Sequence, residues 1–344
     1  CFDYQIGLCP GICLGLISKK DYRKNINNLI LFLKGDKKKL LKKLEKENPE
    51  GLKALQHIQD VALISNFEEE IKKQVQELTW AGKRAPHLVA ILVGENPASK
   101  AYVGSKVKTC AELGFESTLV TYSADVSEQE LLEKINSFNE NKNVDGILVQ
   151  LPLPKHISEE KVIETISPGK DVDGFHPVNL GKMMLSLPTF IPATPYGIML
   201  MLQHYGIKTS GMNCVVIGRS NIVGTPMSLL LSRNSEPGNC TVTMCHSKTS
   251  NMKELCREAD IIVAAIGKPK FVTADMVKEG AIIIDVGINR IESTETKSGF
   301  RLVGDVDFEN VAPKCSYITP VPGGVGLMTI CALMKNTLLA RGVL

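Results

Sequence analysis

The stretch MNCVVIGRSNIVGTPMSLLLSR, residues 212–233, predicts a buried strand, a glycine-containing turn and a helix, in that order. Gly218 and Gly224 border the turn, and Pro226 suits the first turn of a helix. Such a turn can cradle a phosphate group, because the glycines permit close approach and the helix N-terminus offers N–H donors. Ser220 replaces the second glycine of the usual G-x-G-x-x-G pattern, so this turn alone is a weak signal.

Three later segments repeat the pattern and strengthen it. CTVTMCHSKT (240–249), ADIIVAAIG (259–267) and GAIIIDVGIN (280–289) are predicted strands with helical segments between them. A series of this kind predicts βαβ units and a parallel, mononucleotide-binding sheet.

The ends of two neighbouring predicted strands carry polar residues that bear on the cofactor. Arg219 follows the first strand, and Ser247 with Lys248 follows the second. The 2′-phosphate of NADP requires an arginine and hydroxyl donors at about this place, whereas NAD requires an acidic residue. No acidic residue stands there, so the sequence favours NADP; a solvent-facing Arg219 is the alternative.

The chain before residue 190 shows a second strand–helix alternation. Helical segments at 67–78, 98–114 and 127–139 alternate with predicted strands at 87–94, 115–122 and 144–154. This predicts another parallel sheet, whose ligands bind beyond the carboxyl ends of its strands. Three loops lie at such ends: VGENPAS (93–99), VQLPLP (149–154) and GKDVDGFHP (169–177).

Polar side chains in these loops allow two interpretations. Gln150 ends an apolar strand, where it either caps backbone groups or meets a ligand. Asp171 and Asp173 either bond their own backbone in a turn or face a ligand. The loop TPVPGGVG (319–326) holds more proline and glycine than a simple turn needs, which favours a backbone that lies along a flat ligand.

Tyr102 and Lys106 lie one helical turn apart, with the Tyr-x-x-x-Lys spacing of short-chain dehydrogenases. In those enzymes the glycine turn precedes the pair, whereas here it follows by more than a hundred residues. The pair therefore approaches the nicotinamide from another domain, and the short-chain role cannot be carried over.

Bulk composition excludes several classes. The net charge of +3 gives no reason to expect a nucleic-acid partner, and no apolar run is long enough to span a membrane. The ten cysteines include no C-x-x-C pair, which predicts free thiols, no metal site and a reducing, cytoplasmic location.

Residues 1–60 are interpreted as a leader of unknown role, with a basic amphipathic helix predicted over 34–46. This helix is either solvated or a targeting segment, so organellar targeting stays open. The chain begins at Cys1 rather than Met, so we expect a fragment or a processed product.

Eight motifs together resemble the bifunctional methylenetetrahydrofolate dehydrogenase/cyclohydrolase family, in family order over residues 61–341. They are YVGSK (102–106), VDGILVQLPLP (144–154), KDVDGFHPVNLGKM (170–183), PATPYGI (192–198), GRSNIVGTPM (218–227), CHSKT (245–249), GDVDF (304–308) and YITPVPGGVG (317–326). The resemblance implies NADP-dependent oxidation of 5,10-methylenetetrahydrofolate to 5,10-methenyltetrahydrofolate, followed by hydrolysis to 10-formyltetrahydrofolate. It also implies a homodimer.

The expected fold class is α/β, with two domains around a cleft, the second a Rossmann-like doubly wound parallel sheet. After the leader we expect a folate-binding catalytic domain at 61–190, an NADP-binding domain at 191–320, and a C-terminal helix at 321–344 that returns to the first domain.

Residue roles follow from the resemblance position by position. Lys106 matches the family's essential lysine, Tyr102 the tyrosine that stacks on the folate, Gln150 the glutamine that tunes the lysine, and Asp173 the aspartate that holds the pterin. Further implied substrate contacts are Ser99, Val149, Leu151, Pro322, Gly323, Gly324 and Val325. Implied cofactor contacts are Gly218, Arg219, Ser220, Ser247 and Ile288.

Two positions differ from members of the family. Leu327 stands where the family usually has proline, which loosens the start of the last helix. Ser247 stands where NAD-using mitochondrial members have arginine. A dehydrogenase of another substrate on the same plan, such as an amino-acid or shikimate-type enzyme, is one alternative. A non-catalytic folate- or nucleotide-binding protein and an enzyme with one surviving activity are the others.

Overall fold

The computed structural model describes residues 49–294 and 299–343, and side chains from residue 64 onward. Contacts divide the chain into two units, Cys1–Ala62 and Leu63–Leu344. The basic helix predicted over 34–46 lies outside the described residues. Helix α3 (Pro49–Trp80) includes the predicted helical segment 67–78. Within the described part, no helix combines the length and the apolar character needed to cross a bilayer.

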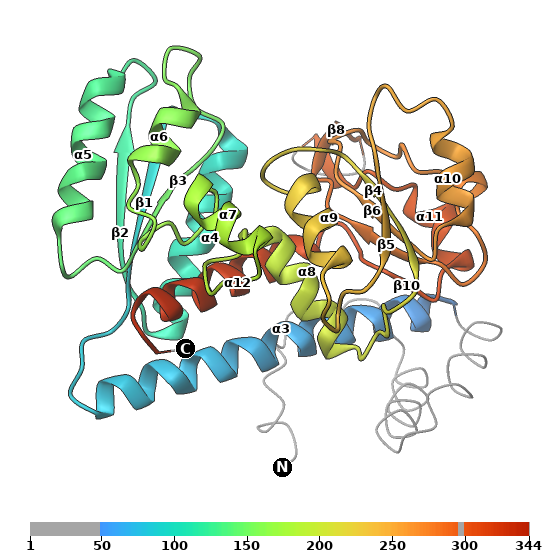
Figure 1. Ribbon diagram of the computed structural model, residues 1–344, viewed down its shortest axis with the longest axis horizontal. Coiled ribbons are helices and arrows are strands. Elements are labelled where there is room, and N and C mark those ends of the chain that lie inside the picture. The colour runs from blue at the N-terminus through green and yellow to red at the C-terminus, as the bar shows by residue number, and fades with distance from the viewer. Residues whose placement is uncertain (1–48, 295–298, 344) are drawn as a thin grey trace. The chain divides into compact units, whose positions relative to one another are not determined.

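The first sheet has three parallel strands in the order β2-β1-β3, which confirms the predicted parallel sheet. Its strands are β1 (His87–Val93), β2 (Glu116–Tyr122) and β3 (Gly146–Val149). Its helices are α4 (Pro97–Leu113), α5 (Glu128–Glu140) and α6 (Glu159–Thr165), and α5 and α6 lie side by side (Figure 1). Helix α7 (Pro177–Met184) follows, and its buried Met183 packs in a core with α8 and β4. β3 is shorter than the predicted strand 144–154, because Pro152 and Pro154 cannot donate to a strand ladder.

Helix α4 shows why the sequence folds locally as predicted. Asn96 caps its start, with Oδ1 accepting from the N–H groups of Ala98 at 2.9 Å and Ser99 at 3.2 Å. Pro97 occupies the first turn, where its missing N–H costs nothing. Gly114 ends the helix in a left-handed conformation with φ of 81°. The helix start is therefore fixed directly after β1.

The second sheet has five parallel strands in the order β10-β7-β6-β4-β5, the Rossmann-like arrangement expected (Figure 1). Its strands are β4 (Asn213–Ile217), β5 (Thr241–Cys245), β6 (Ile261–Ala264), β7 (Ile282–Asp285) and β10 (Tyr317–Ile318). Its helices are α8 (Ala193–His204), α9 (Gly224–Ser232), α10 (Met252–Glu258) and α11 (Phe308–Val311). The chain leaves β4 toward β5 and returns to β6 on the other side. The strand order thus reverses at the carboxyl end of β4, where ligands of such sheets bind.

Smaller elements surround this sheet. Strands β8 (Asn289–Glu292) and β9 (Phe300–Val303) form an antiparallel pair that the sequence did not predict. Two 3₁₀ turns cover Ala274–Met276 and Ala312–Lys314. The predicted strand 240–249 stops at Cys245, because the N–H of Thr249 bonds the carbonyl of His246 at 2.8 Å and closes a turn.

Alternate residues of the central strands face separate cores, as expected for sheets covered on both faces. Cys214 and Val216 of β4 pack with helices α8 and α9, whereas Val215 and Ile217 pack with Cys256 of α10.

The last helix, α12 (Val325–Ala340), packs along α8 and into the core that also holds β1 and α4. Buried Asn336 of α12 donates to the carbonyls of Val172 at 2.8 Å and Ile191 at 2.9 Å. The two helices approach closely at Gly197 of α8, where an added Cβ would lie 2.7 Å from the carbonyl oxygen of Met328. This crossing therefore requires glycine.

We expect Gly197→Ala to lower the free energy of unfolding by about 1–3 kcal/mol, because the new methyl group forces α8 and α12 apart. Urea unfolding followed by circular dichroism measures the loss. Gly181→Ala in α7 is the matched control, since no atom lies within 4 Å of its added Cβ. Equal stability of the two variants would contradict the close approach.

Candidate active site

Helix α4 brings the predicted tyrosine and lysine together. Lys106 is 3% exposed, and its Nζ lies 4.5 Å from the centroid of the Tyr102 ring. Ser99 lies nearly two turns earlier on the same helix and is also buried. The lysine is thus held against an aromatic face inside the protein rather than at its surface.

Gln150 meets the lysine from the end of β3. Its backbone N–H donates to the carbonyl of Ile91 at 2.9 Å, which fixes it at the strand end. Its Nε2 donates to the carbonyl of Leu151 at 2.7 Å, so Oε1 is turned toward Lys106 and accepts from Nζ at 3.3 Å. The partner of the lysine is therefore a neutral amide.

The surroundings of this cluster shift the pKa values of both the lysine and the tyrosine. Burial lowers the pKa of the Lys106 ammonium, and the negative charge of Asp173 opposes that shift. Burial, followed by the charge of Asp173, raises the pKa of the Tyr102 hydroxyl well above its ordinary value. Tyr102 accordingly stays a neutral phenol, whereas the lysine can lose its proton more readily than a solvated one.

The two acids of the segment 170–177 have different surroundings. The Asp171 carboxylate accepts hydrogen bonds from its own turn, as the turn interpretation predicted. The Asp173 carboxylate accepts none from the described residues, although it is only 9% exposed and its charge acts on both Tyr102 and Lys106. The sequence left both acids open, and of the two only Asp173 acts through its charge on the lysine.

Helix α12 adds a residue that the sequence analysis missed. The hydroxyl of Tyr102 interacts with Thr329, and Thr329 contacts Thr194 of α8 at 3.2 Å between the two Oγ1 atoms. Thr329 lies one turn into the helix that follows the glycine-proline loop. No spacing in the sequence links residue 102 to residue 329, because they meet only through packing.

The other expected substrate contacts divide by burial. The side chains of Val149 and Val325 lie in hydrophobic cores, so only their backbone groups can meet a ligand. Leu151, Pro322 and Gly323 are at least partly exposed. Gly324 precedes α12, and a Cβ there would lie 2.6 Å from the carbonyl oxygen of Pro320.

The glycine turn after β4 is shaped by close backbone approach. An added Cβ at Gly218, whose φ is 127°, would lie 2.3 Å from the carbonyl oxygen of Ala265, and one at Gly224 would lie 2.2 Å from that of Gly218. Ser220 Oγ accepts from the N–H groups of Val223 at 3.1 Å and Gly224 at 3.4 Å. These bonds fix the turn at the start of α9, the place where a dinucleotide's phosphates bind in such sheets.

Arg219 and Ser247 follow the ends of adjacent strands, as the sequence predicted. Ile217 pairs with Cys245, and the Gly218 N–H donates to the carbonyl of Cys245 at 2.9 Å. Both side chains are exposed and bond no other described residue, so they can serve a 2′-phosphate. Ile288, which is 58% exposed, follows β7 at the same edge of the sheet.

Two buried carboxylates that the sequence analysis did not assign hold this edge together. Asp305 Oδ2 accepts from the N–H groups of Ile266 at 2.7 Å and Gly267 at 2.9 Å, after β6. Asp285 at the end of β7 accepts from the N–H groups of Gly287, Asp305 and Val306 at 2.8–3.0 Å. Burial raises the pKa of Asp285 to about 6. The motif GDVDF therefore shapes the loops after β6 and β7.

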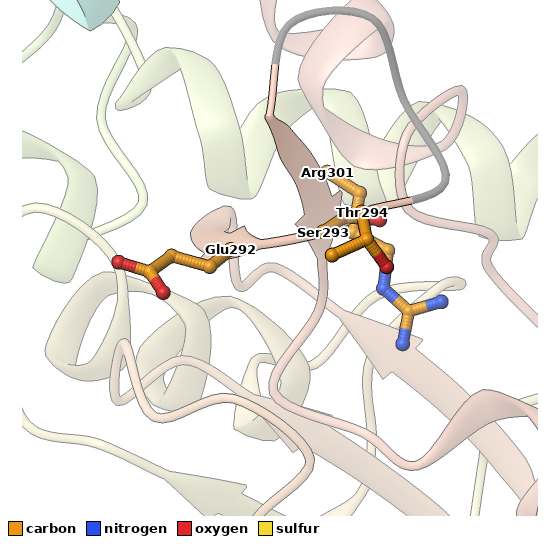
Figure 2. A pocket seen from close by; sticks show the side chains of 4 residues that line it. All are labelled: Glu292, Ser293, Thr294 and Arg301. Atoms are coloured by element: carbon orange, nitrogen blue, oxygen red, sulfur yellow. The ribbon is translucent and has the colours of Figure 1, made fainter.

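A cavity of about 290 Å³ lies at the β8–β9 hairpin, and its lining includes none of these residues. Figure 2 shows its lining: Glu292 extends to one side, whereas Thr294 and Arg301 extend to the other. None of the predicted site residues lines it, so we do not assign the active site to it.

Comparisons with known proteins bear on this arrangement. Residues 58–173 match the catalytic domain of tetrahydrofolate dehydrogenase/cyclohydrolase, and residues 192–342 match the NAD(P)-binding domain of the same family. The bifunctional protein FolD of Cytophaga hutchinsonii is 60% identical over 277 residues, which are 80% of this chain and 96% of that protein.

Two solved structures resemble the chain closely. One is the FolD methylenetetrahydrofolate dehydrogenase/cyclohydrolase of Campylobacter jejuni, 47% identical, with a TM-score of 0.76 over 82% of this chain and 97% of that one. The other is the Trypanosoma brucei enzyme in complex with NADP cofactor and inhibitor, 36% identical, with a TM-score of 0.78 over 82% and 96%. The chain therefore belongs to the tetrahydrofolate dehydrogenase/cyclohydrolase family and contains both of its domains.

Proposed function

We propose that this chain oxidises 5,10-methylenetetrahydrofolate with NADP and hydrolyses the resulting 5,10-methenyltetrahydrofolate to 10-formyltetrahydrofolate at the same site. The observation that carries the proposal is the buried Lys106, held between the Tyr102 ring and the neutral amide of Gln150. The family's two domains, matched over most of the chain, support both activities.

For the first step the chain supplies position and electrostatics. NADP, when bound, supplies the carbon that accepts the hydride. We assign Tyr102 as a flat platform for the folate ring system and Asp173 as the acceptor for the pterin's amino and ring N–H groups. The free carboxylate of Asp173 supports this assignment, because no described residue occupies its lone pairs.

For the second step we assign Lys106 as the group that accepts the proton of the attacking water. The methenyl substrate is a cation, so a permanently charged ammonium beside it would oppose binding. A lysine whose pKa is lowered by burial can stand neutral next to this cation and accept the proton of the attacking water. Gln150 suits the role because it bonds the amine without adding a charge.

The glycine turn supports NADP as the cofactor. The basic side chain of Arg219 and the hydroxyl of Ser247 support it too, because neither bonds another described residue. We assign the diphosphate to the turn at Gly218 and Ser220, the 2′-phosphate to Arg219 and Ser247, and the nicotinamide to the backbone near Ile288. The solved Trypanosoma brucei relative carries NADP. An added Cβ at Gly218 would lie 2.3 Å from the carbonyl oxygen of Ala265, so the shape of this turn requires glycine.

The remaining assignments are proposed on the family resemblance. Ser99, Val149, Leu151 and the loop 322–325 line the folate, and the catalytic domain spans about residues 61–190, the cofactor domain 191–320 and the last helix 321–344. The assembly is a homodimer. Seven described cysteines are free, which supports a reducing, cytoplasmic location.

Spectrophotometry of purified protein with methylenetetrahydrofolate tests the function, once with NADP and once with NAD. We expect NADP-dependent formation of the methenyl product and its accelerated decay. No turnover from folded protein with either cofactor would favour a non-catalytic binder or another substrate.

We expect Lys106→Met to reduce the cyclohydrolase rate about 10²- to 10⁴-fold, because the group that takes the proton from water is lost. Decay of added methenyltetrahydrofolate measures it. Lys108→Met is the matched control, an exposed lysine of the same helix, and should keep the wild-type rate. Full cyclohydrolase activity in the Lys106 variant would show that another group accepts the proton from water.

We expect Arg219→Ala to raise the KM for NADP about 10- to 100-fold, because a charge-assisted bond to the 2′-phosphate is lost. The KM for NAD serves as the internal control and should stay within about twofold, since NAD has no 2′-phosphate. A parallel rise for both cofactors would place Arg219 elsewhere on the dinucleotide.

We expect Asp173→Asn to lower the pKa of Lys106 further, because the charge of Asp173 now supports the protonated amine. NMR of lysine labelled at Cε measures the titration, and the signal missing from Lys106→Met identifies the residue. Exposed Asp125→Asn is the control. An unchanged or higher titration midpoint in Asp173→Asn would show that the two groups do not interact.

A further inference from the structure

Asp171 has a more complete hydrogen-bond environment than a turn-forming acid requires. Its Oδ1 accepts from the N–H of Phe175 at 3.2 Å, and its Oδ2 accepts from the N–H of His176 at 2.8 Å and from Asn179 Nδ2 at 2.9 Å. The side chain is buried, at 2% exposure for the residue. Three donors converging on one buried carboxylate strongly constrain the chain around it.

The segment that Asp171 closes is already fixed at its two backbone ends. On one side Asp171 bridges to Ile147 of β3, next to a bond from the Ile147 N–H to the Lys170 carbonyl at 2.8 Å. On the other side the carbonyl of Asp173 accepts from the N–H of Ala193, at the start of α8, at 3.2 Å. An added Cβ at Gly174 would lie 2.6 Å from the backbone nitrogen of Pro192.

The carboxylate links this fixed turn to the following helix. Asn179 of α7 donates to Asp171 and also to the carbonyl of Pro168 at 3.0 Å. Its Oδ1 accepts from Thr189 Oγ1 at 2.8 Å, so the amide is fully oriented. The chain thus runs tightly from β3 through residues 171–176 into α7, and within this loop the buried Asp173 carboxylate accepts no hydrogen bond from the described residues.

We propose that Asp171 is a positioning residue for the folate site: its carboxylate holds the loop 171–176 closed and thereby directs the unbonded carboxylate of Asp173 toward Lys106 and the pterin. The inference rests on the proposed folate function and deepens it. Asp171 itself touches neither substrate nor cofactor. The burial that raises its pKa to about 6 and the three donors that oppose this shift show how closely the loop surrounds it.

The variant Asp171→Asn tests this role, because it keeps the shape of the side chain but replaces one acceptor oxygen with a donor NH₂. At least one of the three donors then faces another donor, and the loop relaxes. We expect the KM for methylenetetrahydrofolate to rise about 10- to 100-fold, with kcat and the KM for NADP within about threefold.

Discrimination between two substrates, measured as a ratio of their kcat/KM values, separates a positioning role from a general loss of stability, which does not change this ratio. A methylenetetrahydrofolate analogue without the pterin 2-amino group leaves Asp173 unpaired, so the wild-type enzyme should prefer the natural substrate by at least about tenfold in kcat/KM. With Asp173 displaced, we expect Asp171→Asn to lose most of that preference, and we expect the same of Asp173→Ala.

Asp145→Asn is the matched control, because Asp145 is also a buried carboxylate that accepts a backbone N–H, that of His87 at 2.9 Å. It should lower the unfolding midpoint and leave both KM values and the discrimination unchanged. Asn179→Ala provides a milder second variant, since it keeps the two backbone bonds to Asp171. We expect it to raise the folate KM about 3- to 10-fold.

Failure of the inference is distinct from failure of the function. If wild-type protein does not turn over methylenetetrahydrofolate, the proposed function fails. If the wild type is active and Asp173→Ala loses discrimination while Asp171→Asn and Asn179→Ala keep it, the positioning role alone is overturned.

Discussion

The desolvation of Lys106 is the constraint on which the rest of the site depends. An ammonium group loses most of its hydration in this position, so its charged form is stable only to the extent that neighbours replace water. The neighbours are a neutral amide and an aromatic face, while the charge of Asp173 acts on the lysine without a hydrogen bond between the two side chains. A carboxylate in direct contact would keep the lysine protonated. The arrangement therefore keeps the pKa of the amine below that of a solvated lysine, and it leaves the Asp173 carboxylate free for the pterin donors that we propose for it.

This balance explains the use of two acids in one loop. If Asp173 bonded its own turn, its carboxylate could not bind the pterin donors that we propose for it, and if it were free to move, it could pair with Lys106. Asp171 accepts the hydrogen bonds from the loop's donors instead. The Asp173 carboxylate therefore accepts no hydrogen bond from the described residues, while the loop still fixes its place. The burial of Asp171 has a cost, because burial of a carboxylate raises its pKa. Three donors offset that cost in part, which is consistent with a structural requirement for the ionised form.

The sequence predicted most of the long elements, because strand and helix periods are local. The strands β1, β2, β4 and the helices α4, α5 and α9 were predicted to within a few residues, with caps such as Asn96 and Gly114 visible in the sequence. Short elements such as β10, two residues long, and the β8–β9 pair were missed, because they depend on the sheet or partner they join.

The site was predicted less completely for a related reason. Lys106, Gln150 and Asp173 came from motifs, yet their mutual geometry follows from strand order, which one sequence does not encode locally. Thr329 and the Asp285–Asp305 pair were missed because their partners lie 20 to more than 200 residues away, so that only packing reveals them. The resemblance to a family identified the candidate site residues. The hydrogen bonds then show the partner of each side chain and which side chains have no partner among the described residues.

Ser220 shows how a departure from the glycine motif can leave the shape of the turn intact. Glycine at this position would leave the N–H groups of Val223 and Gly224 to water or ligand. The Ser220 hydroxyl accepts from both, so the start of α9 keeps its polar groups satisfied before any phosphate arrives. A hydroxyl also carries its own proton, which a phosphate oxygen can accept once the side chain turns. Because the two close approaches at Gly218 and Gly224 persist, the turn keeps its shape while the residue between them changes. The spacing of glycines alone thus underestimates the capacity of this turn to hold a dinucleotide.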